Sequence, residues 1–250
     1  VFVWDGEQTI NVSNSPSYDY FPVWSNDGQL AWYTDQSDER GTSLQVAVWD
    51  GEQMMLMGRE FGWTDSAYFS ADGVQLSPVW SEDGRLAWNA TDEQGVTSVY
   101  VWDAAQVTHV TDTRSMDTPN LFWLPNGDLI WTILSPRLDL RENTSLWLWD
   151  GEQSFNLAQP SENGIWMTLW GEGQLAFTAG TWDESQLYIW TDVDAVPIST
   201  IQNGRLMYLS GSDQGQLAWI AERNSQQELM MWDGTNTRSL TPIAHADQFP

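Results

Sequence analysis

The stretch PVWSNDGQLAW at residues 22–32 decides the fold, because copies of it return along the chain. It reappears as PVWSEDGRLAW at 78–88 and, in degraded form, as LFWLPNGDLIW at 121–131, TLWGEGQLAF at 168–177 and YLSGSDQGQLAW at 208–219. A second motif, an apolar residue followed by Trp-Asp-Gly or a variant of it, recurs at spacings of 41 to 53 residues. A repeat period in the forties with a turn signal inside each copy is typical of a β-propeller.

Each copy predicts four short strands, which we call A, B, C and D in chain order. Strand A is the apolar run that ends at Trp-Ser, and the Asn-Asp-Gly or Glu-Asp-Gly that follows is a tight hairpin turn, since Gly and Asn tolerate positive φ. Strand B, Gln-Leu-Ala-Trp, alternates with a period of two. Strand C is exemplified by residues 44–49 and strand D by residues 54–57. No segment keeps a period of 3.6, so we expect no long helix.

These motifs resemble the TolB-type propeller repeat, a relative of the WD-repeat, over nearly the whole chain. That family carries Pro-x-Trp-Ser-Pro-Asp-Gly, then a strand like Ile-Ala-Phe and a strand like Ile-Tyr-Val-x-Asp. The sequence departs from the pattern at Asn26 and Glu82, which replace the Pro before Asp-Gly, and at Ser210, where we expect the strand A Trp. Repeats of this type also precede hydrolase domains in enzymes that resemble prolyl oligopeptidase.

The repeats predict an all-β chain with a single propeller domain over residues 1–250. Its expected parts are a partial blade with strands C and D at 1–16, full blades at 17–59, 60–112, 113–158, 159–200 and 201–241, and the start of a further strand A at 242–250. A ring has to close to avoid an unpaired apolar edge, so we expect six blades with the sixth split between the termini. A five-bladed ring with an extra N-terminal hairpin and a stretch of a larger array are alternatives. We interpret the chain as a fragment of a longer protein.

The 18 Trp divide into a repeated set and a remainder. Fourteen recur at equivalent places, and we expect them to pack within and between blades, as large aromatic side chains suit stacked sheets. These structural residues are Trp4, Trp24, Trp32, Trp49, Trp80, Trp88, Trp102, Trp123, Trp131, Trp149, Trp170, Trp190, Trp219 and Trp232.

Four Trp fall outside the repeat pattern, and all are expected on or near the face that carries the D–A and B–C loops. Trp63 and Trp182 lie in such loops, Trp147 near the start of a strand C and Trp166 near the start of a strand A. They either cap the rim of the core or form an aromatic platform for a sugar or a peptide. The longest irregular segment, residues 60–77, belongs to the same face, and loops often carry function. The predicted contact residues are Trp63, Tyr68, Phe69, Trp182, Asp35 and Asp38.

The chain is strongly acidic, with 35 Asp and Glu against 9 Arg and no Lys, a net charge of −26. This balance excludes nucleic acid as a partner, because nucleic-acid binding needs a basic footprint. No apolar run approaches the length of a membrane span, so we expect no membrane insertion. The acids are spread over both faces, as in a solvated surface. No cofactor is indicated; calcium at the loop of residues 35–41 is an alternative, although its spacing is not that of an EF-hand.

Catalytic signatures are lacking. There is no Cys, no Gly-x-Ser-x-Gly and no His-Glu-x-x-His, and of the two His, His109 is expected on a strand D and His245 in the tail. We therefore expect a non-catalytic binding module outside the cytoplasm, with a protein, peptide or glycan as its partner. One alternative is the gating propeller of a hydrolase whose catalytic part lies outside this chain. Another is a structural subunit that assembles through its terminal strands.

Overall fold

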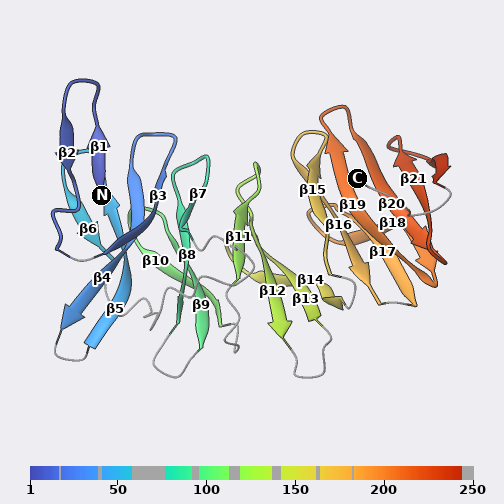
Figure 1. The fold of residues 1–250 in the computed structure, drawn as a ribbon, viewed down its shortest axis with the longest axis horizontal. Coiled ribbons are helices and arrows are strands. Elements are labelled where there is room, and N and C mark those ends of the chain that lie inside the picture. The colour runs from blue at the N-terminus through green and yellow to red at the C-terminus, as the bar shows by residue number, and fades with distance from the viewer. Residues whose placement is uncertain are drawn as a thin grey trace. The chain divides into compact units, whose positions relative to one another are not determined.

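The computed structural model describes residues 1–16, 18–38, 41–57, 77–91, 96–112, 119–136, 142–161, 164–181 and 183–243. Throughout this part of the chain the regular secondary structure consists of β-strands, arranged as one hairpin and five four-stranded sheets (Figure 1). No helix in the described residues is long and apolar enough to cross a membrane.

The strands follow one another through the sheets in sequence order. The hairpin contains β1 (Phe2–Trp4) and β2 (Thr9–Asn11). The first and second sheets contain β3 (Asp19–Trp24), β4 (Leu30–Asp38), β5 (Gly41–Trp49) and β6 (Met54–Leu56), and then β7 (Val79–Trp80), β8 (Leu86–Thr91), β9 (Thr97–Trp102) and β10 (Val107–Asp112). The third contains β11 (Asn120–Trp123), β12 (Leu129–Pro136), β13 (Glu142–Trp149) and β14 (Ser154–Ser161). The last two contain β15 (Met167–Trp170), β16 (Gln174–Gly180), β17 (Glu184–Trp190) and β18 (Ala195–Gln202), and then β19 (Gly204–Ser212), β20 (Gln216–Arg223), β21 (Gln226–Trp232) and β22 (Thr237–Ile243).

This order is the A–B–C–D arrangement that the repeats predict, and the all-β, propeller-type fold is confirmed. The first strand of each sheet is strand A and the fourth is strand D. The number of blades and the closure of the ring stay predictions.

The A–B turns form as their sequences predict. In the first sheet the Ser25 hydroxyl donates to the Asp27 carboxylate over 2.5 Å and accepts the backbone N–H of Gln29 over 2.8 Å. Gly28 adopts a φ of 89°, which only glycine reaches without strain. Ser81 makes the same pair of bonds, at the same lengths, in the second sheet. A serine two residues before Asp-Gly therefore closes these turns with its own side chain.

The C–D turns repeat a second device. In each of five turns an aspartate accepts the backbone N–H groups of the residues two and three positions ahead, over 2.7 to 3.0 Å. Those backbone bonds are the largest cause that lowers the pKa of each carboxyl group. The aspartates are Asp5, Asp50, Asp103, Asp150 and Asp233.

The chain forms two compact units, which we describe separately. Unit 1 comprises Val1–Trp131 and Trp149–Ser154, and unit 2 comprises Thr132–Leu148 and Phe155–Pro250, so that the third sheet contributes to both. In unit 1, neighbouring A strands are joined by indole groups. The Trp80 Nε1–H donates to the Val23 carbonyl over 3.1 Å, and the Trp123 Nε1–H donates to the Val79 carbonyl over 3.0 Å. The repeated strand A Trp thus ties each of these strands to the one before it.

In unit 2, backbone N–H groups donate the bonds that join β15 and β19. Gly171 N–H donates to the Ser212 carbonyl over 2.8 Å, and Gly211 N–H donates to the Thr168 hydroxyl over 3.2 Å. The core between the two sheets includes Leu187 and Trp219, both fully buried.

The register corrects one detail of the repeat alignment. Gly211 pairs with Leu217 as Trp24 pairs with Leu30, so Gly211, and not Ser210, takes the strand A Trp position of the last sheet. An added Cβ at Gly211 would lie 2.8 Å from the Trp170 Cβ of the neighbouring strand. The prediction about Ser210 was wrong because the paired residues are six positions apart in both sheets, and Ser210 lies seven positions before Leu217.

Candidate functional site

The predicted contact residues fall largely outside the described part of the chain. Four of them lie outside the described residues: Trp63, Tyr68, Phe69 and Trp182. The backbone of Asp38 ends β4, but its side chain is outside the described set. Asp35 is described in full and lies on β4, at the end of the sheet that leads into the B–C loop.

Of the other unassigned tryptophans, Trp147 and Trp166 are described. Trp147 lies in the second half of β13, so the expectation that it begins a strand C was wrong, and it lies toward the C–D end of that strand. Its indole donates to the Ser145 hydroxyl over 3.3 Å. Trp166 directly precedes β15, as expected for the start of a strand A, and its backbone N–H donates to the Thr178 hydroxyl over 3.1 Å.

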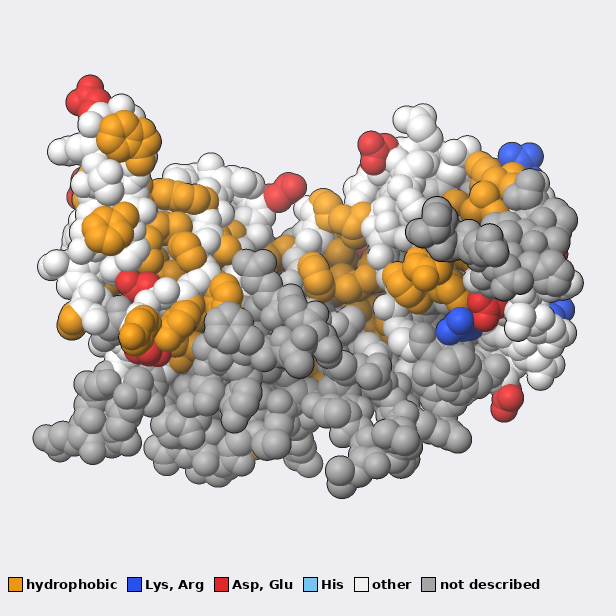
Figure 2. Space-filling model, in the orientation of Figure 1, with side chains coloured by type: hydrophobic (Ala, Val, Ile, Leu, Met, Phe, Trp, Pro, Cys, Tyr) orange, Lys and Arg blue, Asp and Glu red, His pale blue; other side chains and the backbone are white. Residues whose placement is uncertain are grey.

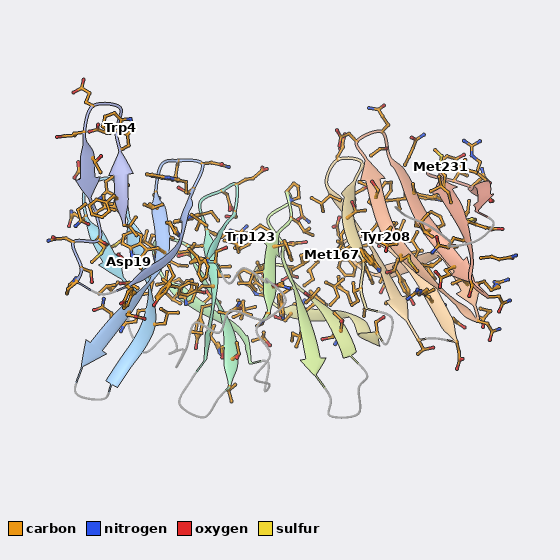
Figure 3. All side chains as sticks on the ribbon, viewed as in Figure 1. Trp4, Asp19, Trp123, Met167, Tyr208 and Met231 are labelled. Atoms are coloured by element: carbon orange, nitrogen blue, oxygen red, sulfur yellow. The ribbon has the colours of Figure 1, made fainter. Side chains whose placement is uncertain are left out.

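Trp166 forms an exposed aromatic pair with Tyr208 of the next sheet. The ring centroids are 4.8 Å apart and the planes are inclined by 49°. Trp166 is 40% exposed and Tyr208 is 60% exposed. Apolar side chains gather around β15 and β19 on the visible face of unit 2 (Figure 2), and Figure 3 labels Tyr208 beside Met167, the first residue of β15. The two rings therefore form one bent aromatic surface shared by two strands.

The backbone of Tyr208 is unusual. Its φ is +54°, in the left-handed region that costs an L-residue free energy, and it lies where the β19–β20 register shifts between Met207 and Ser210. Phe21 occupies the same place in β3, with the same φ of +54° and a register shift between Tyr20 and Val23. Strand A thus carries, in two sheets, a bulge that presents an aromatic residue at a strained position.

A second aromatic group lies in unit 1 beside Asp35, and we call Tyr18, Tyr20 and Asp35 the Tyr20–Asp35 cluster. The Tyr20 hydroxyl donates to Asp35 Oδ2 over 3.3 Å. The Tyr18 and Tyr20 rings lie 6.4 Å apart at an angle of 33°, and Tyr18 is 75% exposed. Burial and the Asp35 carboxylate raise the pKa of the Tyr20 hydroxyl, so it stays protonated as the donor at neutral pH.

In unit 2, the acidic residues beside the B–C loops accept hydrogen bonds from neighbouring side chains. Glu184 accepts Gln186 and Gln202 side-chain N–H groups, each over 2.6 Å. Glu222 accepts the Arg205 guanidinium over 3.1 Å and the Gln227 amide over 2.8 Å. Among the described residues, by contrast, Tyr20 supplies the one hydrogen bond to the Asp35 carboxylate. Asp35 therefore keeps more unused acceptor capacity than either Glu184 or Glu222.

The remaining candidates are His109, the calcium alternative and the repeated Trp. His109 lies on β10, a strand D, with its ring 5.2 Å from the Tyr100 ring. Within the described ranges, no three His, Asp or Glu side chains come close enough together to hold a metal ion, although the calcium alternative at residues 35–41 falls partly outside them. Eight of the fourteen repeated Trp are buried, whereas Trp4 and Trp24 are 64% and 53% exposed. The buried ones are Trp32, Trp88, Trp102, Trp131, Trp149, Trp190, Trp219 and Trp232.

The repeat pattern did not predict Tyr18, Tyr20 and Tyr208 as site residues. Tyr18 and Tyr20 precede a Pro-x-Trp motif and could have been noted as an aromatic run. Tyr208 gives no such signal, because a left-handed tyrosine within a strand has no sequence signature.

No family model matches the chain. Among solved structures, it is similar to an acylaminoacyl peptidase of Pyrococcus horikoshii, with 12% identity over 90% of this chain and 46% of that one and a TM-score of 0.47. It is also similar to a puromycin-hydrolysing peptidase of Mycobacterium tuberculosis (12% identity, 92% and 40% coverage, TM-score 0.48) and to TolB of Acinetobacter baumannii (17%, 95% and 57%, 0.41). The chain spans less than half the length of the two peptidases. Its repeated four-stranded antiparallel sheets are consistent with a TolB-like β-propeller.

Proposed function

We propose that this chain is a non-catalytic binding module, working outside the cytoplasm, that holds a peptide segment of a protein partner across Trp166 and Tyr208. The resemblance of the repeat motif supports the location, and the exposed side chains of Trp166 and Tyr208 support the binding surface. The observation that carries the proposal is the exposed contact between these two rings.

The backbone of Tyr208 supports a binding role. A tyrosine in the left-handed region costs about 1–2 kcal/mol, and strained residues of this kind cluster at ligand-binding positions. Phe21, at the same position of β3, turns its ring to the core, whereas most of the Tyr208 side chain faces solvent. Holding the ring against Trp166 before a partner arrives reduces the ordering cost of binding.

The chemistry of the pair fits a peptide. Trp and Tyr are the residues that most often dominate the binding energy at protein interfaces, because each combines a large apolar ring with one polar group. The Trp166 indole N–H and the Tyr208 hydroxyl are both on exposed side chains and can bond a partner's backbone.

The proposal is tested by selecting ligands from a random-peptide display library on the wild-type protein. Selected peptides are then titrated against Trp166→Ala and Tyr208→Ala. We expect each substitution to weaken binding by about tenfold or more, which corresponds to about 1.4 kcal/mol.

Leu240→Ala is the matched control, since Leu240 is a 43% exposed apolar residue of the same unit, on β22. It should leave the affinity unchanged. A glycan array is run in parallel on the wild-type protein. Failure to select any peptide, peptides that bind both ring variants normally, or ligands found among glycans alone would each overturn the proposal.

A further inference from the structure

We propose that the Tyr20–Asp35 cluster of unit 1 is a separate binding site for a cationic side chain, and specifically for an arginine of a partner peptide. Tyr20 of this site lies on β3, Asp35 lies on β4, and Tyr18 directly precedes β3. The site includes neither Trp166 nor Tyr208.

The cluster is built rather than incidental. The Asp35 backbone N–H donates to the Tyr18 carbonyl over 2.9 Å, which fixes Tyr18 beside β4. The Tyr20 hydroxyl fixes one oxygen of the Asp35 carboxylate, and the Tyr20 ring lies 6.3 Å from the Phe21 ring, which packs on the core. The carboxylate and the aromatic rings are thus held in place from two strands.

The cluster offers two attractions to a cation at one place. The faces of tyrosine rings attract cations, and Tyr18 exposes most of its side chain. Beside them, Asp35 has one hydrogen-bond partner among the described residues, whereas Glu184 and Glu222 each have two partners. A carboxylate with unused acceptor capacity next to an exposed ring suits a guanidinium, which accepts bidentate pairing and also stacks on aromatic faces.

Charge complementarity favours the same ligand. The chain carries a net charge of −26, so its field attracts cationic partners and repels anionic ones. Arginine is favoured over lysine because its planar group satisfies the carboxylate and the rings together, whereas an ammonium is a strongly hydrated point charge. The field steers the partner toward the protein, and the cluster selects where the arginine binds.

The experiment uses two peptides that differ in one residue, a Gly-Ser peptide with a central arginine and its counterpart with neutral citrulline. Binding of each to the whole chain is measured by calorimetric titration or by chemical-shift changes. We expect the arginine peptide to bind about tenfold more tightly than the citrulline peptide, with an affinity that falls as salt is added.

Asp35→Asn and Glu52→Gln form the matched pair of variants, because each removes one negative charge from unit 1. Glu52 is exposed in the C–D turn of the same sheet, and its turn is closed by its backbone N–H and not by its side chain. Asp35→Asn should lower the affinity for the arginine peptide about tenfold, and Glu52→Gln should change it less than about twofold.

Two further variants test whether a loss of binding results from misfolding. Tyr18→Ala removes an exposed ring and should weaken arginine binding without changing the thermal midpoint. Tyr20→Phe keeps the ring but removes the hydrogen bond that fixes the Asp35 carboxylate, so it should also weaken binding, and by less than Asp35→Asn. Equal losses in Asp35→Asn and Glu52→Gln, or equal binding of the arginine and citrulline peptides, would overturn the inference. Neither result bears on the Trp166–Tyr208 pair, whose variants Trp166→Ala and Tyr208→Ala should bind the arginine peptide normally.

Discussion

Trp170 and Trp232 meet edge to face across two neighbouring sheets, with ring centroids 5.0 Å apart and planes at 71°. In the first two sheets the same contact is made within one sheet, between the Trp of strand A and the Trp of strand C, at 6.2 Å for Trp24 and Trp49. The last sheet has Gly211 at the strand A position, and Trp170 of the preceding sheet supplies the missing ring. Trp232 therefore makes its edge-to-face contact with a Trp of the neighbouring sheet and not with one of its own sheet.

The close approach at Gly211 predicts that a larger residue at this position destabilises the chain. In Gly211→Ala the new methyl group would overlap the Leu169 carbonyl and lie 2.8 Å from the Trp170 Cβ. Overpacking of this kind costs about 1–3 kcal/mol. Urea denaturation should show a lower free energy of unfolding with an unchanged slope. Ser210→Ala, at the exposed neighbouring position of β19, serves as the comparison.

The indole bonds of unit 1 predict a different loss. Trp80→Phe keeps an aromatic ring but removes the donor to the Val23 carbonyl, and Trp123→Phe removes the donor to the Val79 carbonyl. Each should lower the free energy of unfolding by about 1 kcal/mol beyond the effect of the smaller ring. Trp24→Phe measures that ring effect at an exposed, corresponding position. Losses equal to that of Trp24→Phe would show that the two bonds contribute nothing.

Arg85 links two A–B turns, and its replacement should lower the free energy of unfolding. Its guanidinium pairs with Asp83 over 3.0 Å, donates to the Gly127 carbonyl over 2.7 Å and lies 4.6 Å from the centre of the Trp123 ring. Because Asp83 is mostly exposed, we attribute the stabilisation chiefly to the ring and the carbonyl. Arg85→Met should destabilise the chain by about 1 kcal/mol, and salt should change the wild-type value little. A strong salt dependence would instead assign the effect to the ion pair.

The C–D turns predict a defined response to pH. Backbone N–H groups lower the pKa of the Asp50 carboxyl below its unfolded value of about 4, so the charged form stabilises the folded state. This contribution is fully present above the unfolded pKa and is lost as the pH falls through the folded pKa. The difference in unfolding free energy between wild type and Asp50→Ala should therefore be largest near neutral pH and shrink below about pH 4. A difference that is constant with pH would contradict this origin.

The strain at Tyr208 can be measured separately from binding. Tyr208→Gly and Tyr208→Ala both remove the ring, but only glycine adopts a φ of +54° without penalty. Tyr208→Gly should therefore be more stable than Tyr208→Ala by about 1 kcal/mol, as measured by urea denaturation. Equal stabilities would show that the bulge relaxes and that the tyrosine is not held under strain.

The repeats predicted the strands and turns because their signals are local. Ser25 and Ser81 close their turns with their own side chains, so the motif contains the reason for the structure. The repeat motif does not predict the register of the fourth sheet, because the A–B turn of that sheet is one residue shorter. Trp170 therefore pairs with Gln174, whereas Trp24 of the first sheet pairs with Leu30. Trp170 can reach Trp232 because Gly211, a residue of another repeat, leaves space for it. A pattern within one repeat cannot predict a contact that depends on two repeats.

The candidate sites were predicted only in part. Asp35 was chosen because acids cluster in the B–C loops, and the structure adds the Tyr20 hydroxyl that distinguishes it from the others. Trp166 was noted because it falls outside the repeat, but its partner Tyr208 lies in the next sheet and meets it through tertiary packing. Loop sequence predicts which residues are exposed, and it does not predict which exposed residues meet.

The most direct test of the binding surface is fluorine NMR on the protein labelled with 5-fluorotryptophan, with the Trp166 resonance assigned from a Trp166→Phe variant. A peptide selected on the wild-type protein is added to saturation. The proposed function predicts that the Trp166 resonance shifts or broadens, while that of Trp24, an exposed residue of unit 1, stays in place. A Trp166 resonance that is unchanged at saturation would contradict the account.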